Sequence, residues 1–159
     1  MKTLQIEESK ARSIYKTASA ELKVMLEDTF SKEFFLQKVT ERIDGWNDML
    51  AETGRPDIPE FSDLPEDLRD HFKKYYKVVV MTEAYNEGVK MDIYNKDKKR
   101  HYPYFATNGS PAGFRFYDSS YDSTDAGAGS GSRLSLKEQE LSDQIGHKHT
   151  DIYREWLES

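Results

Sequence analysis

The chain contains no cysteine, and this absence excludes several kinds of chemistry. Its 159 residues form no disulfide bond, offer no thiolate nucleophile and bind no zinc through sulfur. Long apolar runs are absent as well, because no stretch approaches the roughly 18 apolar residues that a membrane-spanning helix needs. The beginning of the chain also lacks the apolar centre of a signal peptide. We therefore expect an intracellular protein that works in the cytoplasm.

Recognised catalytic motifs are missing too. The sequence has no serine hydrolase elbow, no glycine-rich phosphate loop and no zinc protease histidine pair. Acid–base chemistry would have to use His71, His101 or His147, or carboxylates that the sequence does not single out. We therefore predict a protein that is not an enzyme, and we keep a small enzyme of unknown class as the last alternative.

Charge and aromatic content describe what the chain does have. Charged residues make up 33% of it and the net charge is −6, which argues against binding nucleic acid over the whole surface. A local basic patch is compatible with that total. Hydrophobic residues contribute only 36%, but the 13% that are aromatic each bury a large area. The length predicts a single domain over residues 1–159.

Apolar residues recur at helical spacing in the first part of the chain, residues 5–88. A first amphipathic helix is predicted from about residue 7 to 28. A second helix is predicted to begin after an N-cap at Ser31 and to end at Gly54. The short connection between them predicts an antiparallel helical hairpin.

A third helix completes this predicted helical part. Asp63 and Glu66 have the spacing of a capping box, and the helix is expected to end at Gly88. Its centre, residues 78–81, is apolar all round. We therefore predict that this helix lies in the middle of the fold.

After Gly88 the apolar period changes, and residues 89–118 predict an aromatic hairpin. Its strands are expected over 102–107 and 113–118, joined by a loop of about five residues. Residues 119–132 are rich in glycine and serine and predict a flexible loop. A short third strand at Arg133 and Leu134 would follow it.

The last segment, residues 135–157, predicts one long helix that begins with a capping box of Ser135 and Glu138. Its apolar stripe consists of Leu141, Ile145, His149, Ile152 and Trp156. The predicted fold is α+β: three or four helices pack on a small antiparallel sheet of two or three strands, and the C-terminal helix closes the core.

The hairpin carries the best candidate for a binding surface, because basic residues lie beside aromatic ones. In a strand, Phe114 and Phe116 point one way and Arg115 points the other, so one face can be core and the other a recognition platform. The alternative is that helices cover both faces and that the lysines merely solvate a turn. The candidate binding residues are Lys96, Lys98, Lys99, Arg100, Tyr102, Tyr104, Arg115 and Tyr117.

Two groups of residues suggest metal binding at first sight. His147, His149 and Asp151 are spaced as H-x-H-x-D, but on a helix His149 points away from the other two. We interpret His149 as a packed core histidine and His147 as a surface residue. A second group, Asp118, Asp122 and Asp125, does not have the spacing of a calcium loop. We predict no metal site and no cofactor.

Five segments resemble a family of small, uncharacterised proteins encoded by Bacteroidetes phages and prophages. The segments are KTASAELK (16–23), LEDTFSKEF (26–34), YPYF (102–105), GSRL (131–134) and IYREW (152–156). The resemblance spans most of the chain and implies a viral protein that acts in the host cytoplasm or in the virion. It implies no catalytic residue. The chain departs from this family at Leu136, where an aromatic is usual, and in its more charged segment 96–100.

Taken together, these features predict a phage-encoded interaction or structural protein that works through the aromatic hairpin and its basic shoulder. Its partner would be another protein or a second copy of the chain. The alternative is a single-stranded nucleic-acid-binding protein, since such proteins hold the backbone by charge and the bases by stacking on aromatic rings. That alternative requires the cations to converge beside exposed tyrosines.

Overall fold

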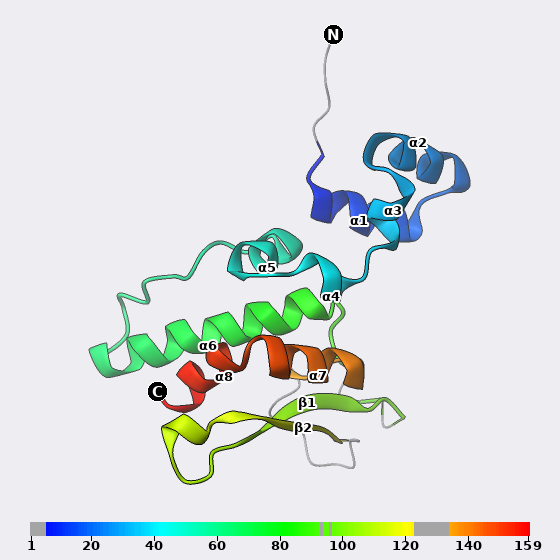
Figure 1. Cartoon of the computed structure of the whole chain (residues 1–159). Coiled ribbons are helices and arrows are strands. Elements are labelled where there is room, and N and C mark those ends of the chain that lie inside the picture. Colours follow the sequence, from blue (N-terminus) through cyan, green and yellow to red (C-terminus); the bar gives the residue numbers. More distant parts are fainter. Residues whose placement is uncertain (1–5, 93, 96, 123–133) are drawn as a thin grey trace.

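The structure, a computed structural model, describes residues 6–92, 94–95, 97–122 and 134–159 (Figure 1). Eight α-helices and one two-stranded antiparallel hairpin lie in these ranges, so the fold class is α+β. The helices are α1 (Glu8–Thr17), α2 (Ala20–Phe30), α3 (Lys32–Leu36), α4 (Val39–Arg42), α5 (Trp46–Thr53), α6 (Glu66–Tyr85), α7 (Gln139–Lys148) and α8 (Thr150–Leu157). The strands are β1 (Arg100–Ala106) and β2 (Arg115–Asp122), with the 3-10 helix η1 (Pro111–Gly113) between them.

Helix α6 runs through the middle of the molecule, as its apolar centre predicts. Val78, Val79, Val80 and Met81 are all buried. Helix α5 packs on one side of α6 and helix α8 on the other, while the hairpin lies beyond α7 (Figure 1). Helices α1 to α3 extend from one end of this stack. The order of these layers leaves the hairpin at the edge of the molecule.

The first predicted helix is wrong in its length, because the chain breaks between α1 and α2. Ala18 is extended, and the Ser19 hydroxyl accepts a hydrogen bond from the backbone N–H of Leu22 at 3.4 Å. A serine that caps a helix satisfies one of the N–H groups that the first turn leaves unpaired. Ser19 therefore starts a new helix where the apolar period alone predicts continuity.

The second predicted helix is also wrong, since the segment from Ser31 to Gly54 forms three short helices. Ser31 does cap α3 by accepting from the N–H of Phe34, and Gly54 does end α5, with a left-handed backbone at φ 65°. Between them the chain turns at Gly45. The Asp48 carboxylate accepts from the N–H of Gly45 at 2.9 Å and so begins α5.

The start of α6 differs from the predicted capping box. The helix begins at Glu66, directly after Pro65, and the side chain of Asp63 does not cap it. Glu66 lies in the first turn, where negative charge is favourable. The helix ends near the predicted glycine: Gly88 has φ 74° and donates from its N–H to the carbonyl of Glu83 at 3.1 Å.

The C-terminal helix begins later than predicted and is divided in two. Ser135 does not cap it: Glu138 precedes the first turn of α7, and Leu136 pairs with His101 by two backbone hydrogen bonds of 2.8 and 3.0 Å. The Asn86 side chain holds this segment through the carbonyl of Ser135 and the N–H of Lys137. Helices α7 and α8 then meet at His149. Together they close the core, as the predicted single helix was expected to do.

The sheet has two strands, and both are shifted from the predicted bounds: β1 begins and ends earlier than 102–107, whereas β2 begins and ends later than 113–118. The predicted loop 119–132 is wrong at its start, because residues 119–122 belong to β2. The rest of that loop lies outside the described residues, as does Arg133. Leu134 belongs to no strand, so the predicted third strand is replaced by the single bridge at Leu136.

None of the helices in the described ranges is long and apolar enough to cross a membrane. The longest, α6, has charged and polar residues throughout its first half.

Candidate hairpin interface and a charged cavity

The inner side of the hairpin is packed against the C-terminal helices. The Phe105 ring lies 5.0 Å from the ring of Phe114, 6.2 Å from that of Phe116 and 5.0 Å from that of Tyr153 in α8, measured between centroids. On the same side the Ser119 hydroxyl bonds to a serine hydroxyl of α7 at 2.8 Å. Phe114 and Phe116 therefore lie on the core side, as strand alternation predicts.

The opposite side carries three of the hairpin's tyrosines, Tyr102, Tyr104 and Tyr117. Tyr104 is 53% exposed and Tyr117 is 70% exposed, and the Tyr102 ring lies 5.9 Å from that of Tyr104. Arg115 is exposed on this side as well. We call the surface formed by Tyr102, Tyr104, Arg115 and Tyr117 the outer face. Within the described part of the chain, α7 covers one side of the hairpin and no helix lies over the outer face (Figure 1).

A β-bulge increases the exposure of Tyr117. Tyr104 pairs with Asp118, whereas the next residue, Phe105, pairs with Phe116, so Tyr117 has no opposite residue in the ladder. Such a bulge bends the strand and directs the extra side chain away from the regular pleat. Bulges and charged side chains also discourage edge-to-edge pairing of strands. The bulge therefore favours recognition through the tyrosine side chains over the addition of a strand.

The predicted basic residues do not gather in one place. Lys98 and Lys99 are exposed before β1, but Arg100 is only 3% exposed and Lys96 lies outside the described residues. Arg115 pairs with Ala106 at the other end of the hairpin, about 20 Å away at the usual strand rise. The Lys99 ammonium lies 4.1 Å from the ring centroid of Tyr121, a cation–π contact. Two lysines thus mark one end of the hairpin, and one arginine marks the other.

The histidines occupy separate environments. His71 bonds to the Ser159 hydroxyl at 2.9 Å, and the exposed His147 packs its ring 4.3 Å from that of Phe116. Burial lowers the pKa of His101, and the nearby Lys99 charge lowers it further. Among the residues that the structure describes, no group of three histidine, aspartate or glutamate side chains is arranged to hold a metal ion.

His149 is buried, as the helical stripe predicts. Its Nε2 lies 2.9 Å from the hydroxyl of Tyr85, and both rings belong to the core between α6 and the C-terminal helices. Burial lowers the pKa of His149 to about 4, with a further contribution from Lys148, and burial raises the pKa of Tyr85 to about 12. Both groups are therefore neutral at neutral pH.

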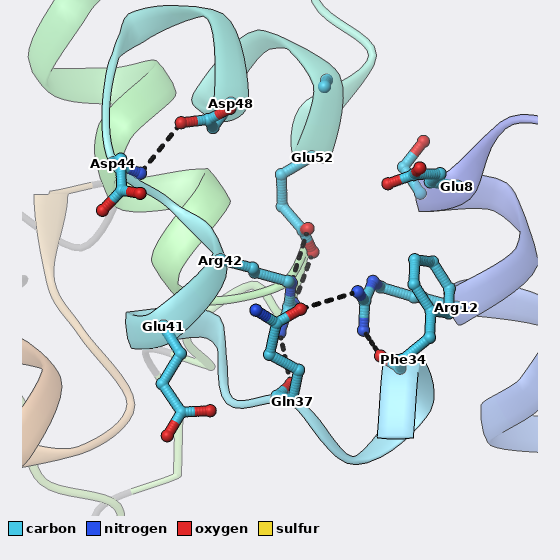
Figure 2. Close-up of a pocket in the computed structure, with 11 residues that line it drawn as sticks. Glu8, Arg12, Phe34, Gln37, Glu41, Arg42, Asp44, Asp48 and Glu52 are labelled. Carbon is cyan, nitrogen blue, oxygen red and sulfur yellow. Dashed lines mark hydrogen bonds and ion pairs between the residues drawn. The ribbon is translucent and has the colours of Figure 1, made fainter. Parts of the chain in front are cut away.

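A second candidate site, a cluster of charged residues around Arg42, lies on the other side of α6. Arg42 donates to both carboxylate oxygens of Glu52 at 2.9 and 3.0 Å (Figure 2). It also donates to Glu87 at 3.0 Å. Glu87 also accepts from Lys137 at 2.7 Å, and Lys16 lies 3.3 Å from it. Burial alone raises the pKa of Glu87, but these cations outweigh it and lower the pKa to about 2.

This cluster connects parts of the chain that are far apart in sequence. Arg42 ends α4, Glu52 lies in α5, and Glu87 follows α6 with a left-handed backbone at φ 52°. Nothing in the sequence predicts it, because its members have no shared spacing and the chain contains many charged residues. Only the folded arrangement brings these charges together.

Comparison with known proteins gives the chain no relatives. No protein family model, no curated protein and no solved structure matches it. The candidate sites are therefore argued from their geometry and chemistry.

Proposed function

We propose that the chain is a non-enzymatic, phage-encoded interaction protein that binds a protein partner through the outer face. The observation that carries the proposal is the exposure of Tyr104 and Tyr117 on a hairpin whose other side is anchored to the core. Tyrosine is enriched where proteins meet, because its ring buries a large area while its hydroxyl still bonds to a polar group. The phage origin is supported by the sequence resemblance alone.

The chemistry of the outer face supports a protein partner over other classes. Arg115 and Asp118 place one charge of each sign beside the tyrosines, so the surface is close to neutral. A neutral aromatic patch suits an interface with an apolar centre and a polar rim. The same patch is also compatible with a second copy of the chain. The host cytoplasm is the proposed setting, with the virion as the alternative.

Single-stranded nucleic acid is the second candidate, and the contact of Lys99 with the Tyr121 ring favours it. A strand of nucleic acid would need cations along its whole path beside the stacking rings. Lys98 and Lys99 supply them at one end, whereas Arg100 is buried. The separation of Arg115 from the lysines makes this candidate the weaker one.

The proposal is tested by placing a photo-crosslinking amino acid at position 104 or 117 of the full chain in cells that produce it. Position 94 is the control, because Tyr94 is 90% exposed and does not belong to the outer face. We expect discrete protein adducts from 104 and 117 but not from 94. The double substitution Tyr104→Ser and Tyr117→Ser should weaken capture of that partner roughly tenfold or more, while Tyr94→Ser leaves it unchanged.

The alternatives give different results in the same experiments. Self-association would produce an adduct with the mass of two chains and a concentration-dependent sedimentation coefficient. Nucleic-acid binding would appear as saturable binding of a labelled oligothymidylate, with an affinity that falls as the salt concentration rises. Equal adducts at all three positions, or equal effects of all the tyrosine substitutions, would mean that the outer face is not the binding surface.

A further inference from the structure

Helix α1 presents a stripe of hydroxyl and cationic side chains to a cavity. Ser9, Arg12, Ser13 and Lys16 are spaced by three, one and three residues, so they lie on one face of the helix. All four line a cavity of about 610 Å³ between α1 and the wall formed by α5 and the turn after α6. This volume is in the range of small-molecule sites.

Arg12 is the unusual member of this stripe. It is only 8% exposed, and burial and the nearby charge of Arg42 lower its pKa, although the charges of Glu52, Glu8 and Glu87 offset part of this effect. Its guanidinium donates to the carbonyl of Phe34 and, at 3.2 Å, to the side-chain oxygen of Gln37, and it stacks on the Phe34 ring (Figure 2). In the described part of the chain no carboxylate lies within ion-pair distance of it. Buried charges are normally paired, because removal from water is costly.

The remaining charges of the cavity wall favour an anion beside Arg12. The wall carries four cations, which are Arg12, Lys16, Arg55 and Lys90, and three carboxylates. Each of those carboxylates is already bound to a cation: Glu52 to Arg42, Glu83 to Arg55, and Glu87 to Arg42. These pairs also engage two of the wall cations, Arg55 with Glu83 and Lys16 with Glu87, whereas Arg12 has no carboxylate partner among the described residues and keeps further N–H groups for a ligand.

The neighbouring cavity, which also touches Arg12, is less suited to an anion. Its volume is about 340 Å³, and five carboxylates and two arginines line it (Figure 2). An anion there would meet a surplus of negative charge. The larger cavity, with the serines of α1 on its wall, is the favourable side.

We propose that the cavity between α1 and α5 binds a small oxyanion, a phosphate or carboxylate group, through Arg12 with Ser9, Ser13 and Lys16. The guanidinium forms charge-assisted hydrogen bonds to the anion oxygens, the serine hydroxyls donate to them, and Lys16 adds charge at the mouth. Lys16 is half-exposed and lies 3.3 Å from Glu87, so it can turn toward a ligand with little loss. This site is separate from the outer face and does not depend on it.

The test is a titration of the full chain with inorganic phosphate, glycerol 3-phosphate and succinate, each against sodium chloride of equal ionic strength. We expect saturable shifts of the backbone amide NMR signals of residues 9–16 and 53–56 with at least one of the three anions. The anion that binds identifies the source as free phosphate, a phosphate ester or a carboxylate. Shifts with none of them would overturn the proposal.

Matched substitutions localise the site. Lys16→Gln should weaken binding roughly threefold to tenfold, and Arg12→Gln should abolish it. Lys10→Gln is the control, because it removes the same charge from an exposed position of α1 that does not line the cavity, and it should leave the dissociation constant unchanged. If Arg12→Gln does not fold, Ser13→Ala at an exposed position replaces it and should also weaken binding. Equal effects of Lys10→Gln and Lys16→Gln would show general charge attraction and refute the site.

Discussion

The contact of Gly146 with Phe116 fixes the hairpin on α7, and Gly146→Ala tests that contact. An ideal Cβ at Gly146 would lie 2.2 Å from Cδ2 and 2.4 Å from Cε2 of the Phe116 ring. Carbon atoms in contact are normally about 3.5–4.0 Å apart, so the ring would have to move by more than about 1 Å. The ring has little room, because His147 packs 4.3 Å from it on one side and Phe105 lies at 6.2 Å.

Two opposing effects decide the sign of the change in stability. Alanine in a helix interior is more favourable than glycine by about 1 kcal/mol. Inserting a methyl group into a packed contact costs about 1–3 kcal/mol, and the overlap here is severe. We therefore expect Gly146→Ala to lower the free energy of unfolding by about 1–2 kcal/mol. For a chain of this length that corresponds to a fall in Tm of roughly 3–6 °C.

The assay is urea unfolding followed by circular dichroism, on a double-mutant cycle with Phe116→Leu. Leucine removes the ring atoms that the new methyl group meets, so Gly146→Ala should be neutral or stabilising in the Phe116→Leu background. The two substitutions should then be non-additive by more than about 1 kcal/mol. A stabilising effect of Gly146→Ala in the original chain, or strict additivity, would refute the close packing of α7 on the hairpin.

Two further predictions concern pH. The pKa of His149 falls from its ordinary 6.5 to about 4 in the folded chain, so the unfolded chain binds the proton more readily. The free energy of unfolding should therefore be highest above pH 6.5. It should fall by on the order of 2–3 kcal/mol as pH drops to 4. His149→Gln should flatten this part of a pH series of urea midpoints, and an unchanged slope would contradict the neutral buried imidazole. The pKa of Glu87 is lowered to about 2, so its ionised carboxylate stabilises the fold above pH 4.5. This stabilisation is lost as pH falls toward 2. Glu87→Gln should lower the free energy of unfolding by on the order of 2 kcal/mol at pH 7. It should also reduce the difference in urea midpoint between pH 5 and pH 3. Equal pH profiles of the two proteins would show that Glu87 is not held by its cations.

The long apolar patterns of the sequence predict the centre of the fold well. The run from Val78 to Met81 is buried all round, and His149 packs in the core as its place in the stripe indicates. These features depend on burial, which hydrophobic periodicity reports directly. The same holds for the division of the hairpin into Phe116 inside and Tyr117 outside.

Helix boundaries were predicted poorly where short polar contacts decide them. The cap at Ser19 and the carboxylate of Asp48 at Gly45 interrupt patterns that remain helical in their apolar spacing. A serine before Glu21 and an Asp-Gly pair are recognisable signals for such breaks. At Ser135 the sequence predicts a helix start, but the neighbouring Leu136 pairs with His101 instead. No local signal indicates this pairing, because the segment is held by Asn86, which lies at the end of α6 and is distant in sequence.

The candidate binding residues divide in the same way. Alternation along β2 predicts the exposure of Tyr117. In contrast, the nearness of the basic residues of segment 96–100 in sequence wrongly suggested that they form one exposed group. Arg100 is adjacent to Lys99 and yet is only 3% exposed, and its burial depends on the folded packing, which adjacency in the sequence does not report. The cavity at Arg12 has no sequence signal, because half of its wall comes from α5 and the turn after α6.

The positions of the outer face and the Arg12 cavity make their tests independent. The outer face lies beyond α7, whereas the cavity lies beside α1 and α5, with α6 between them (Figure 1). Substitutions at sites that share no contacts change stability and binding additively within about 0.5 kcal/mol. Tyr117→Ser should therefore leave anion binding unchanged, and Lys16→Gln should leave crosslinking through position 117 unchanged. Coupling between the two would require α6 to shift as a unit, and its buried contacts with both layers oppose such a shift.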